Sequence, residues 1–246
     1  MLLTMVGMLK LVQIKCTINS EPIIVCLERN FQADNIQPNE IINKNLKKLT
    51  MKKFYLLITW LSAFVYPFSF GQTTDSFIDN RDSTIYKTVT IGNQVWMAEN
   101  LRYNIIGSWC PFHDSSYCKY GRYYTFEMAQ KACPAGWYLP TLKDFEELTT
   151  YLGGVDVAGT ALKAHTPWGN SNSTVFRSSG FSALPSGLLS CDGVLFGSGQ
   201  SAFYWLVTEN NSTSAYYFTL NSFCSSAYSS YYNKLAGFSV RCIKNN

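Results

Sequence analysis

Hydrophobic and polar residues alternate over residues 86–97, with one short break in the middle. The runs Tyr86–Ile91 and Gln94–Met97 each alternate with a period of two, and Gly92-Asn93 separates them. A period of two indicates a strand with one buried face, and a glycine-containing pair between two such runs favours a tight turn. The pattern therefore predicts a β-hairpin.

Two helical patterns follow the hairpin. Residues 123–133 offer apolar side chains to a core, and Pro134-Ala135-Gly136 ends the first pattern. Trp137–Leu139 then reads as a short buried strand. In the second helix Thr141 is the expected N-cap, and Asp144 completes a variant of the capping box. The buried face of this helix is formed by residues at i, i+3 and i+7, namely Phe145, Leu148 and Leu152, and Gly153-Gly154 ends it.

Beyond Val155 the pattern changes to short strands and turns. The strand candidates are Phe181–Leu189, Ala202–Thr208, Ala215–Leu220 and Phe238–Ile243. In the last of these, Ser239 and Arg241 fall on the face opposite to Phe238, Val240 and Cys242. A hairpin, two grouped helices and then a run of strands predict an α+β fold with helices packed on short antiparallel sheets.

The residues before this domain resemble an export signal. Met51-Lys52-Lys53 precedes an apolar run, Phe54–Tyr66, and small residues stand at Ser69 and Gly71. A basic start, a short apolar run and a small-residue cleavage site are typical of a secretory signal peptide, whereas a membrane span needs about 20 apolar residues. The expected organisation is a spurious or disordered extension (1–50), a signal peptide (51–71), a flexible lead-in (72–85) and the domain (86–246). The protein is therefore expected to be secreted or on the surface of a bacterium, without a transmembrane span in its mature form.

The charge composition of the chain argues against one class of binding partner. Only 15% of the residues are charged, and the net charge of +4 arises entirely within residues 1–71. The rest of the chain is neutral and has no basic patch, which argues against nucleic-acid binding.

Six cysteines follow the predicted signal peptide. An even number in an exported chain indicates disulfides, and six cysteines permit 15 pairings. We expect the pairs Cys110–Cys118, Cys133–Cys242 and Cys191–Cys224. None of the cysteines has the spacing of a zinc or thioredoxin-like site.

Several ordered strings in the chain resemble the Fibrobacter succinogenes major paralogous domain, a family of secreted bacterial proteins. The resemblance covers about residues 86–244 and is carried by Val89–Leu101, Tyr120–Thr125, Ala132–Pro140, Phe181–Gly187, Tyr204-Trp205 with Thr208-Glu209, and Gly237–Cys242. Trp137–Glu146 and Val240–Cys242 are also similar to the wider C-type lectin-like fold. That fold implies a disulfide from the helix region to the last strand, in agreement with Cys133–Cys242.

Calcium binding of the lectin kind is not supported by the residues. Calcium requires six to eight oxygen ligands, and the Glu-Pro-Asn and Trp-Asn-Asp motifs of sugar-binding C-type lectins are missing from the predicted domain. No cofactor is therefore expected. The nearest substitute is Glu209-Asn210-Asn211, for which a simple polar turn is the competing interpretation.

The aromatic residues are the stronger indication of a binding surface. Tyr228, Tyr231 and Tyr232 lie among Ser and Asn, where exposure is expected, and Tyr is enriched in binding surfaces. Tyrosines at exposed strand positions need no ligand, so a structural role is the alternative. Five further aromatics are expected to be structural: Trp96, Trp137, Phe181, Trp205 and Phe238.

We find no arrangement typical of an enzyme. Two isolated histidines supply little acid–base capacity, and Gly197–Ser201 departs from the hydrolase elbow. The expected function is a non-catalytic binding module for glycans or surface proteins. The alternatives are a structural, variable display domain without a small-molecule ligand and an uncharacterised extracellular enzyme.

Overall fold

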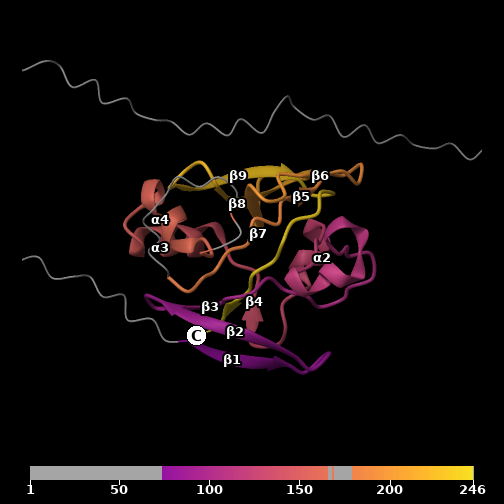
Figure 1. The fold of residues 1–246 in the computed structure, drawn as a ribbon, viewed down its shortest axis with the longest axis horizontal. Helices are drawn as coiled ribbons and strands as arrows, with labels where there is room; N and C mark the ends of the chain where they lie inside the picture. The colour runs from indigo at the N-terminus through magenta and orange to yellow at the C-terminus, as the bar shows by residue number, and fades with distance from the viewer. Residues whose placement is uncertain (1–73, 166–167, 169–178, 246) are drawn as a thin grey trace, which may run out of the picture. The chain divides into compact units, whose positions relative to one another are not determined.

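The computed structural model describes residues 74–165, 168 and 179–245. Within them the α+β prediction is confirmed: short helices accompany antiparallel sheets (Figure 1). The predicted extension and signal peptide lie outside the described residues. No helix in the described part is long and apolar enough to cross a membrane.

The first sheet has five strands in the spatial order β1-β2-β3-β10-β4. Thr88 pairs with Met97, which confirms the predicted hairpin. Ile243 pairs with both Trp96 and Tyr138, so the last strand lies in the interior of the sheet. The strands are β1 (Thr74–Asp79), β2 (Thr84–Ile91), β3 (Gln94–Met97), β4 (Trp137–Tyr138) and β10 (Ile243–Lys244).

The flexible lead-in predicted for 72–85 is wrong for its described part, because β1 lies there and pairs with β2. The ring of Phe77 stacks on Tyr86 at 5.5 Å and on Trp137 at 4.4 Å between ring centroids. One inward-facing aromatic ring therefore anchors an edge strand whose other side chains, apart from exposed Ile78, are polar, and such a strand has little hydrophobic signal.

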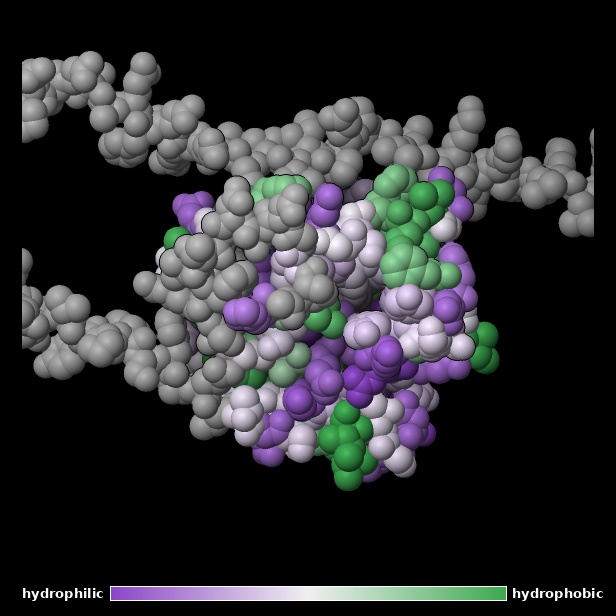
Figure 2. Space-filling view, in the orientation of Figure 1, coloured by the Kyte–Doolittle hydropathy of each residue, from purple (hydrophilic) through white to green (hydrophobic). Residues whose placement is uncertain are grey.

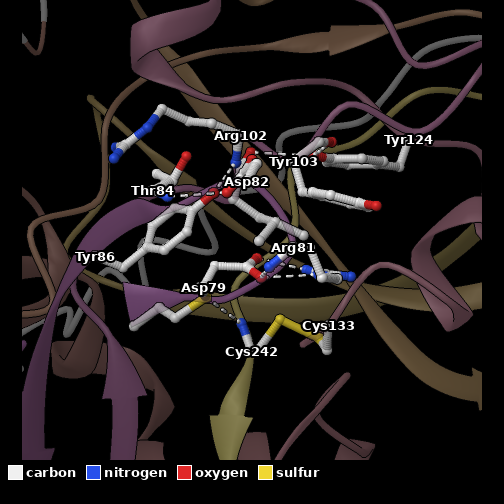
Figure 3. A network of polar contacts seen from close by, with 12 residues as sticks. Asp79, Arg81, Asp82, Thr84, Tyr86, Arg102, Tyr103, Tyr124, Cys133 and Cys242 are labelled. Carbon is white, nitrogen blue, oxygen red and sulfur yellow. Dashed lines mark hydrogen bonds and ion pairs between the residues drawn. A yellow bond between two sulfur atoms is a disulfide. The ribbon is translucent and has the colours of Figure 1, made fainter. Parts of the chain in front are cut away.

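A polar network fixes the turn between β1 and β2 (Figure 3). The buried carboxylate of Asp79 accepts bonds of 2.9 and 2.7 Å from Nε and Nη2 of Arg81, whose guanidinium lies 3.7 Å from the Tyr103 ring centroid. Burial alone would raise the pKa of Asp79, but the hydrogen bonds and charge of Arg81 outweigh it and lower the pKa. The backbone N–H of Arg102 donates to the Tyr86 hydroxyl at 2.9 Å. The hairpin is thereby tied to the segment that follows β3.

The second sheet has the order β7-β8-β9, with all neighbours antiparallel. Its strands are β7 (Ser201–Glu209), β8 (Ser214–Asn221) and β9 (Ala227–Asn233), and a separate pair is formed by β5 (Leu188–Leu189) and β6 (Leu195–Phe196). The predictions for β7 and β8 are confirmed, whereas β9 was not expected as a strand. The candidate Phe181–Leu189 contributes only β5.

Helices α3 (Leu142–Tyr151) and α4 (Val155–Leu162) pack beside this second sheet (Figure 1). The capping box of Thr141 and Asp144 is confirmed, and Phe145 of α3 stacks on Phe218 of β8 at 4.9 Å. Helix α4 was not predicted. Its Gly159 lies so close to the backbone of Ser226 that a side chain there would collide with it.

The remaining helices are α2 (Phe126–Gln130) and the 3₁₀ segments η2 (Pro111–His113) and η3 (Ser115–Tyr120). Helix α2 is shorter than predicted, because Tyr123 and Tyr124 form bridges with Trp109 and Phe238 instead of entering the helix. The predicted strand 238–243 is likewise reduced to bridges and β10. Ser239 and Arg241 are as buried as Phe238, Val240 and Cys242, so neither side of this segment faces solvent.

Four of the five aromatics expected to be structural are fully buried, and the fifth, Trp137, is half-buried against Phe77. In the core the Trp205 ring stacks on Phe238 at 4.2 Å, and its Nε1 donates to the Tyr124 carbonyl at 2.9 Å. These contacts join the second sheet to the start of α2 and to the last segment.

Candidate binding surface

Three exposed aromatic rings gather on and just after a loop that a disulfide closes. Cys110 is bonded to Cys118, eight positions later, and the loop contains η2 and most of η3. Phe112 is 57% exposed, Tyr117 39% and Tyr120 47%. We call Phe112, Tyr117 and Tyr120 the loop aromatic cluster.

The three rings form a continuous set. The centroids of Phe112 and Tyr117 are 4.9 Å apart with the rings at 66°, and those of Tyr117 and Tyr120 are 6.2 Å apart at 45°. The ammonium nitrogen of Lys119 lies 5.1 Å from the Tyr120 centroid. Edge-to-face and tilted contacts of this kind are favourable, so the rings support one another without being buried.

The backbone of the loop adopts a conformation that side chains rarely take. Phe112 and His113 have φ values of 58° and 55°, in the left-handed region that favours glycine. Buried Pro111 anchors one end of the loop, and Cys118 is bonded back to Cys110 at the other. Such strain persists only where the surroundings hold it, and it is concentrated at functional sites.

Arg122 fastens the loop to the rest of the domain. Its Nε donates to the Ser108 hydroxyl at 2.7 Å and its Nη2 to the Ser108 carbonyl at 2.8 Å. Its Nη1 lies 3.2 Å from the sulfur of Cys110 and 2.9 Å from that of Cys118. One guanidinium therefore contacts both the base of the loop and its disulfide.

Polar side chains are interleaved with the rings. His113, Asp114, Ser115, Ser116 and Lys119 are all exposed. The backbone N–H of Ser116 donates to Asp114 Oδ1 at 2.8 Å, and this bond lowers the pKa of Asp114. The loop thus combines aromatic surface with an ionised acceptor, hydroxyls and an ammonium donor. Among the described residues no group of three or more His, Cys, Asp or Glu is placed to hold a metal ion.

Two other apolar surfaces lie on hairpins, and Figure 2 shows green surface over both of them. Ile78 and Ile85 pair across β1 and β2 and are exposed, and so are Val194 and Phe196 at β6. These surfaces are aliphatic or contain a single ring, and they do not combine several rings with interleaved polar groups as the loop does.

The predicted acidic and amide residues lie at the end of β7, at Glu209, and in the turn between β7 and β8, at Asn210 and Asn211. Asn211 Oδ1 accepts from the N–H groups of Thr213 and Ser214, each at 2.9 Å, and Asn210 Nδ2 donates to the Ser214 hydroxyl at 3.0 Å. Glu209 forms a 2.7 Å ion pair with Lys234. These polar groups form hydrogen bonds and an ion pair within or beside the turn, which favours the interpretation as a simple polar turn.

The predicted tyrosines are divided between the two faces of β9. Tyr228 and Tyr232 point to one face and Tyr231 to the other, because successive strand residues alternate. Tyr232 is half-buried and its ring lies 5.6 Å from Phe238 in the core, while Tyr231 is 55% exposed beside Tyr216. The six predicted residues therefore do not converge on one surface.

Two of the three expected disulfides are confirmed. Cys110–Cys118 and Cys133–Cys242 are present, and the second joins the end of α2 to the residue before β10. Cys191 and Cys224 are each disulfide-bonded. Their pairing with each other stays a prediction.

The sequence analysis did not predict the loop aromatic cluster, because the tyrosines of the second half are more numerous and closer together in the chain. The available signal was three aromatic residues in and just after a short Cys–Cys loop, at Phe112, Tyr117 and Tyr120. Spacing alone does not show that these rings touch, so the cluster can be recognised only once the geometry of the loop is known.

Comparison with known proteins gives one match. Residues 89–244 match the family described as the Fibrobacter succinogenes major domain. Neither the curated proteins nor the solved structures gave a match. The family match spans more than half of the chain and contains the second sheet, β3, β4 and β10 of the first sheet, α2 to α4 and the loop aromatic cluster. The chain therefore belongs to the Fibrobacter succinogenes major domain family.

Proposed function

We propose that this domain is a non-catalytic binding module, secreted or held at the cell surface, and that it binds glycans through the loop aromatic cluster. The observation that carries the proposal is the set of three exposed rings, linked through Tyr117, on and just after a disulfide-closed loop. Aromatic side chains supply large contact area at low entropic cost, and a preformed loop reduces that cost further.

The surroundings of the rings favour a sugar over an apolar partner. A pyranose ring has a face of C–H groups that packs on an aromatic ring and an edge of hydroxyls that needs hydrogen-bond partners. The loop offers both kinds of contact, since Asp114, Ser115 and Lys119 stand exposed among the rings. A uniformly apolar partner would leave these polar groups without partners.

The proposal includes a C-type lectin-like fold and export. Two helices beside a sheet and the bridge from the end of α2 to the last segment support the fold assignment. The disulfides and the signal-like leader support an oxidising compartment. Binding in this proposal does not depend on calcium, because the loop has one carboxylate, Asp114, and calcium needs six to eight oxygens.

Binding of the purified chain to a glycan array, followed by calorimetry with the best oligosaccharide, tests the proposal. The double variant Tyr117→Ala with Tyr120→Ala should lose about tenfold or more in affinity, while chelation of calcium should change nothing. Tyr231→Ala is the matched control, because it removes an equally exposed ring from a different surface.

Three outcomes would contradict the proposal. Loss of binding in Tyr231→Ala alone would move the site to the β8–β9 sheet. The absence of binding to any glycan would favour the display-domain alternative. Turnover of a polysaccharide that Glu209→Gln abolishes would make the protein an enzyme.

A further inference from the structure

We propose that the Cys110–Cys118 disulfide is a thiol–disulfide exchange site, reducible by low-molecular-weight thiols while Cys133–Cys242 stays intact. The environment of the two sulfurs supports this exchange, and the proposed ligand plays no part in it. Both cysteines of the loop bridge are partly exposed, so an external thiol can reach them.

The cation beside the bridge is the central observation. Arg122 Nη1 lies within hydrogen-bond distance of both sulfurs, and Ser108 holds the guanidinium in place through two further bonds. No carboxylate of the described residues forms an ion pair with Arg122. Its charge is therefore available to stabilise a thiolate that forms at this position.

The geometry assigns the roles of the two sulfurs. Cys118 is nearer to the guanidinium, at 2.9 Å against 3.2 Å for Cys110. An external thiolate attacks the Cys110 sulfur, a new S–S bond forms there, and the Cys118 thiolate leaves against Arg122. A second thiolate then attacks the external sulfur of this mixed disulfide and releases Cys110. Two thiols are oxidised to one disulfide, and the protein bridge is reduced to two thiols.

The second bridge provides an internal comparison. Cys242 is fully buried, and its N–H donates to the Met97 sulfur at 3.3 Å. Among the described residues, no hydrogen bond or ion pair brings a cation to the sulfurs of Cys133–Cys242. Cys133 is partly exposed, but attack there would expel the Cys242 thiolate into the core with no cation beside it, so this bridge should be reduced slowly or only after the core opens.

Opening the loop bridge also changes the loop itself. The bridge helps to hold Phe112 and His113 in the left-handed region, and its loss releases that strain. The loop aromatic cluster should then disperse. If the proposed function is right, reduction weakens glycan binding, although the exchange reaction does not depend on it.

The experiment treats the purified oxidised chain with graded glutathione, alkylates free thiols at timed intervals and identifies the labelled cysteines by mass spectrometry. Cys110 and Cys118 should be labelled at least about tenfold faster than Cys133 and Cys242. Arg122→Gln should slow this labelling about tenfold, and Arg122→Lys should restore part of the rate. Lys119→Gln, which removes a neighbouring cation that does not contact the sulfurs, should leave the rate unchanged.

A readout on the reduced wild-type protein keeps the test independent of folding in the variants. Alkylation of Cys118 should reach its plateau about one pH unit lower than alkylation of free cysteine, because Arg122 favours the thiolate. Equal reduction of the two bridges, or an Arg122→Gln rate equal to that of Lys119→Gln, would overturn the proposal. Tight glycan binding by a chain with an inert bridge would overturn this inference alone.

Discussion

Arg241 Nε donates a 2.9 Å hydrogen bond to Oδ1 of Asn100, which joins residues 141 positions apart in the chain. Arg241 is 1% exposed, and its guanidinium also donates to the carbonyls of Phe181 and Ser182 and lies 4.3 Å from the Phe181 ring centroid. Among the described residues no carboxylate forms an ion pair with it. Carbonyl oxygens and aromatic rings are thus the direct contacts that stabilise this buried cation.

Arg241→Lys should lower the free energy of unfolding by about 3 kcal/mol, because one ammonium cannot reach the acceptors that the planar guanidinium serves. Urea unfolding followed by tryptophan fluorescence measures the change. Lys143→Met, at a fully solvated position of α3, is the control and should be neutral. If Arg241→Lys unfolded at the same urea concentration as wild type, the hydrogen bonds of Arg241 would make no net contribution to the free energy of unfolding.

Asn100 also links this network to the aromatic loop, since its Nδ2 donates to the Tyr120 carbonyl at 3.2 Å. Gly121 has a φ of 116°, and a Cβ there would lie 2.5 Å from Cβ of Asn100. Gly121→Ala should therefore destabilise the domain by about 2 kcal/mol more than a substitution that strains only the backbone. Gly136→Ala is that comparison, because Gly136 has a φ of 83° and open space around it. Equal thermal shifts in the two variants would contradict the close approach.

The stability of the domain should rise with pH between about 8 and 10 because of Lys163. This side chain is buried, donates to the Cys224 carbonyl and lies 5.3 Å from the Trp168 ring centroid. Burial lowers the pKa of Lys163 to about 8, so the folded state loses this proton while the unfolded chain keeps it up to about pH 10.4. The unfolded state binds more protons in this window, and the free energy of unfolding should increase by about 2–3 kcal/mol across it.

Urea titrations at pH 7.5, 8.5 and 9.5 measure this slope, and Lys163→Met should abolish it. Above pH 10 the sign should reverse. Burial raises the pKa of Tyr86 to about 12, so the unfolded chain loses the tyrosine proton first. A flat wild-type profile from pH 8 to 10 would contradict the assignment to Lys163.

The two disulfides should differ in their contribution to stability. Replacing Cys133 and Cys242 by Ala opens a link across 109 positions and should cost about 4–5 kcal/mol in the chain-entropy account. The pair Cys110 and Cys118 spans eight positions and should cost about 2.5 kcal/mol. Calorimetric unfolding of both double variants gives the comparison, and a larger loss from the loop pair would contradict it.

The elements predicted correctly are those governed by local rules. Gly92 between two alternating runs specifies the β2–β3 hairpin, and Thr141 with Asp144 specifies the start of α3. Helix α4 has no such signal, because Gly154 precedes it without a side-chain cap. Strand β9 was missed because its tyrosines and serines are equally typical of an exposed loop.

The site was less predictable than the fold, because it depends on contacts between distant segments. Arg241 occupies an alternating position that indicates an exposed side chain, yet Asn100 and Phe181 surround it. The loop aromatic cluster needs Arg122 and Ser108 to set the base of the loop. Neither relationship follows from a periodicity.

Strand β10 lies between β3 and β4, although α3, α4 and the whole second sheet separate it from β4 along the chain. Until β10 has been synthesised, β3 and β4 are two unfinished edges and Cys133 has no Cys242 to meet. The first sheet can therefore close only after the second sheet has left the ribosome, and a chain cut between β9 and β10 should be degraded and not merely weakened.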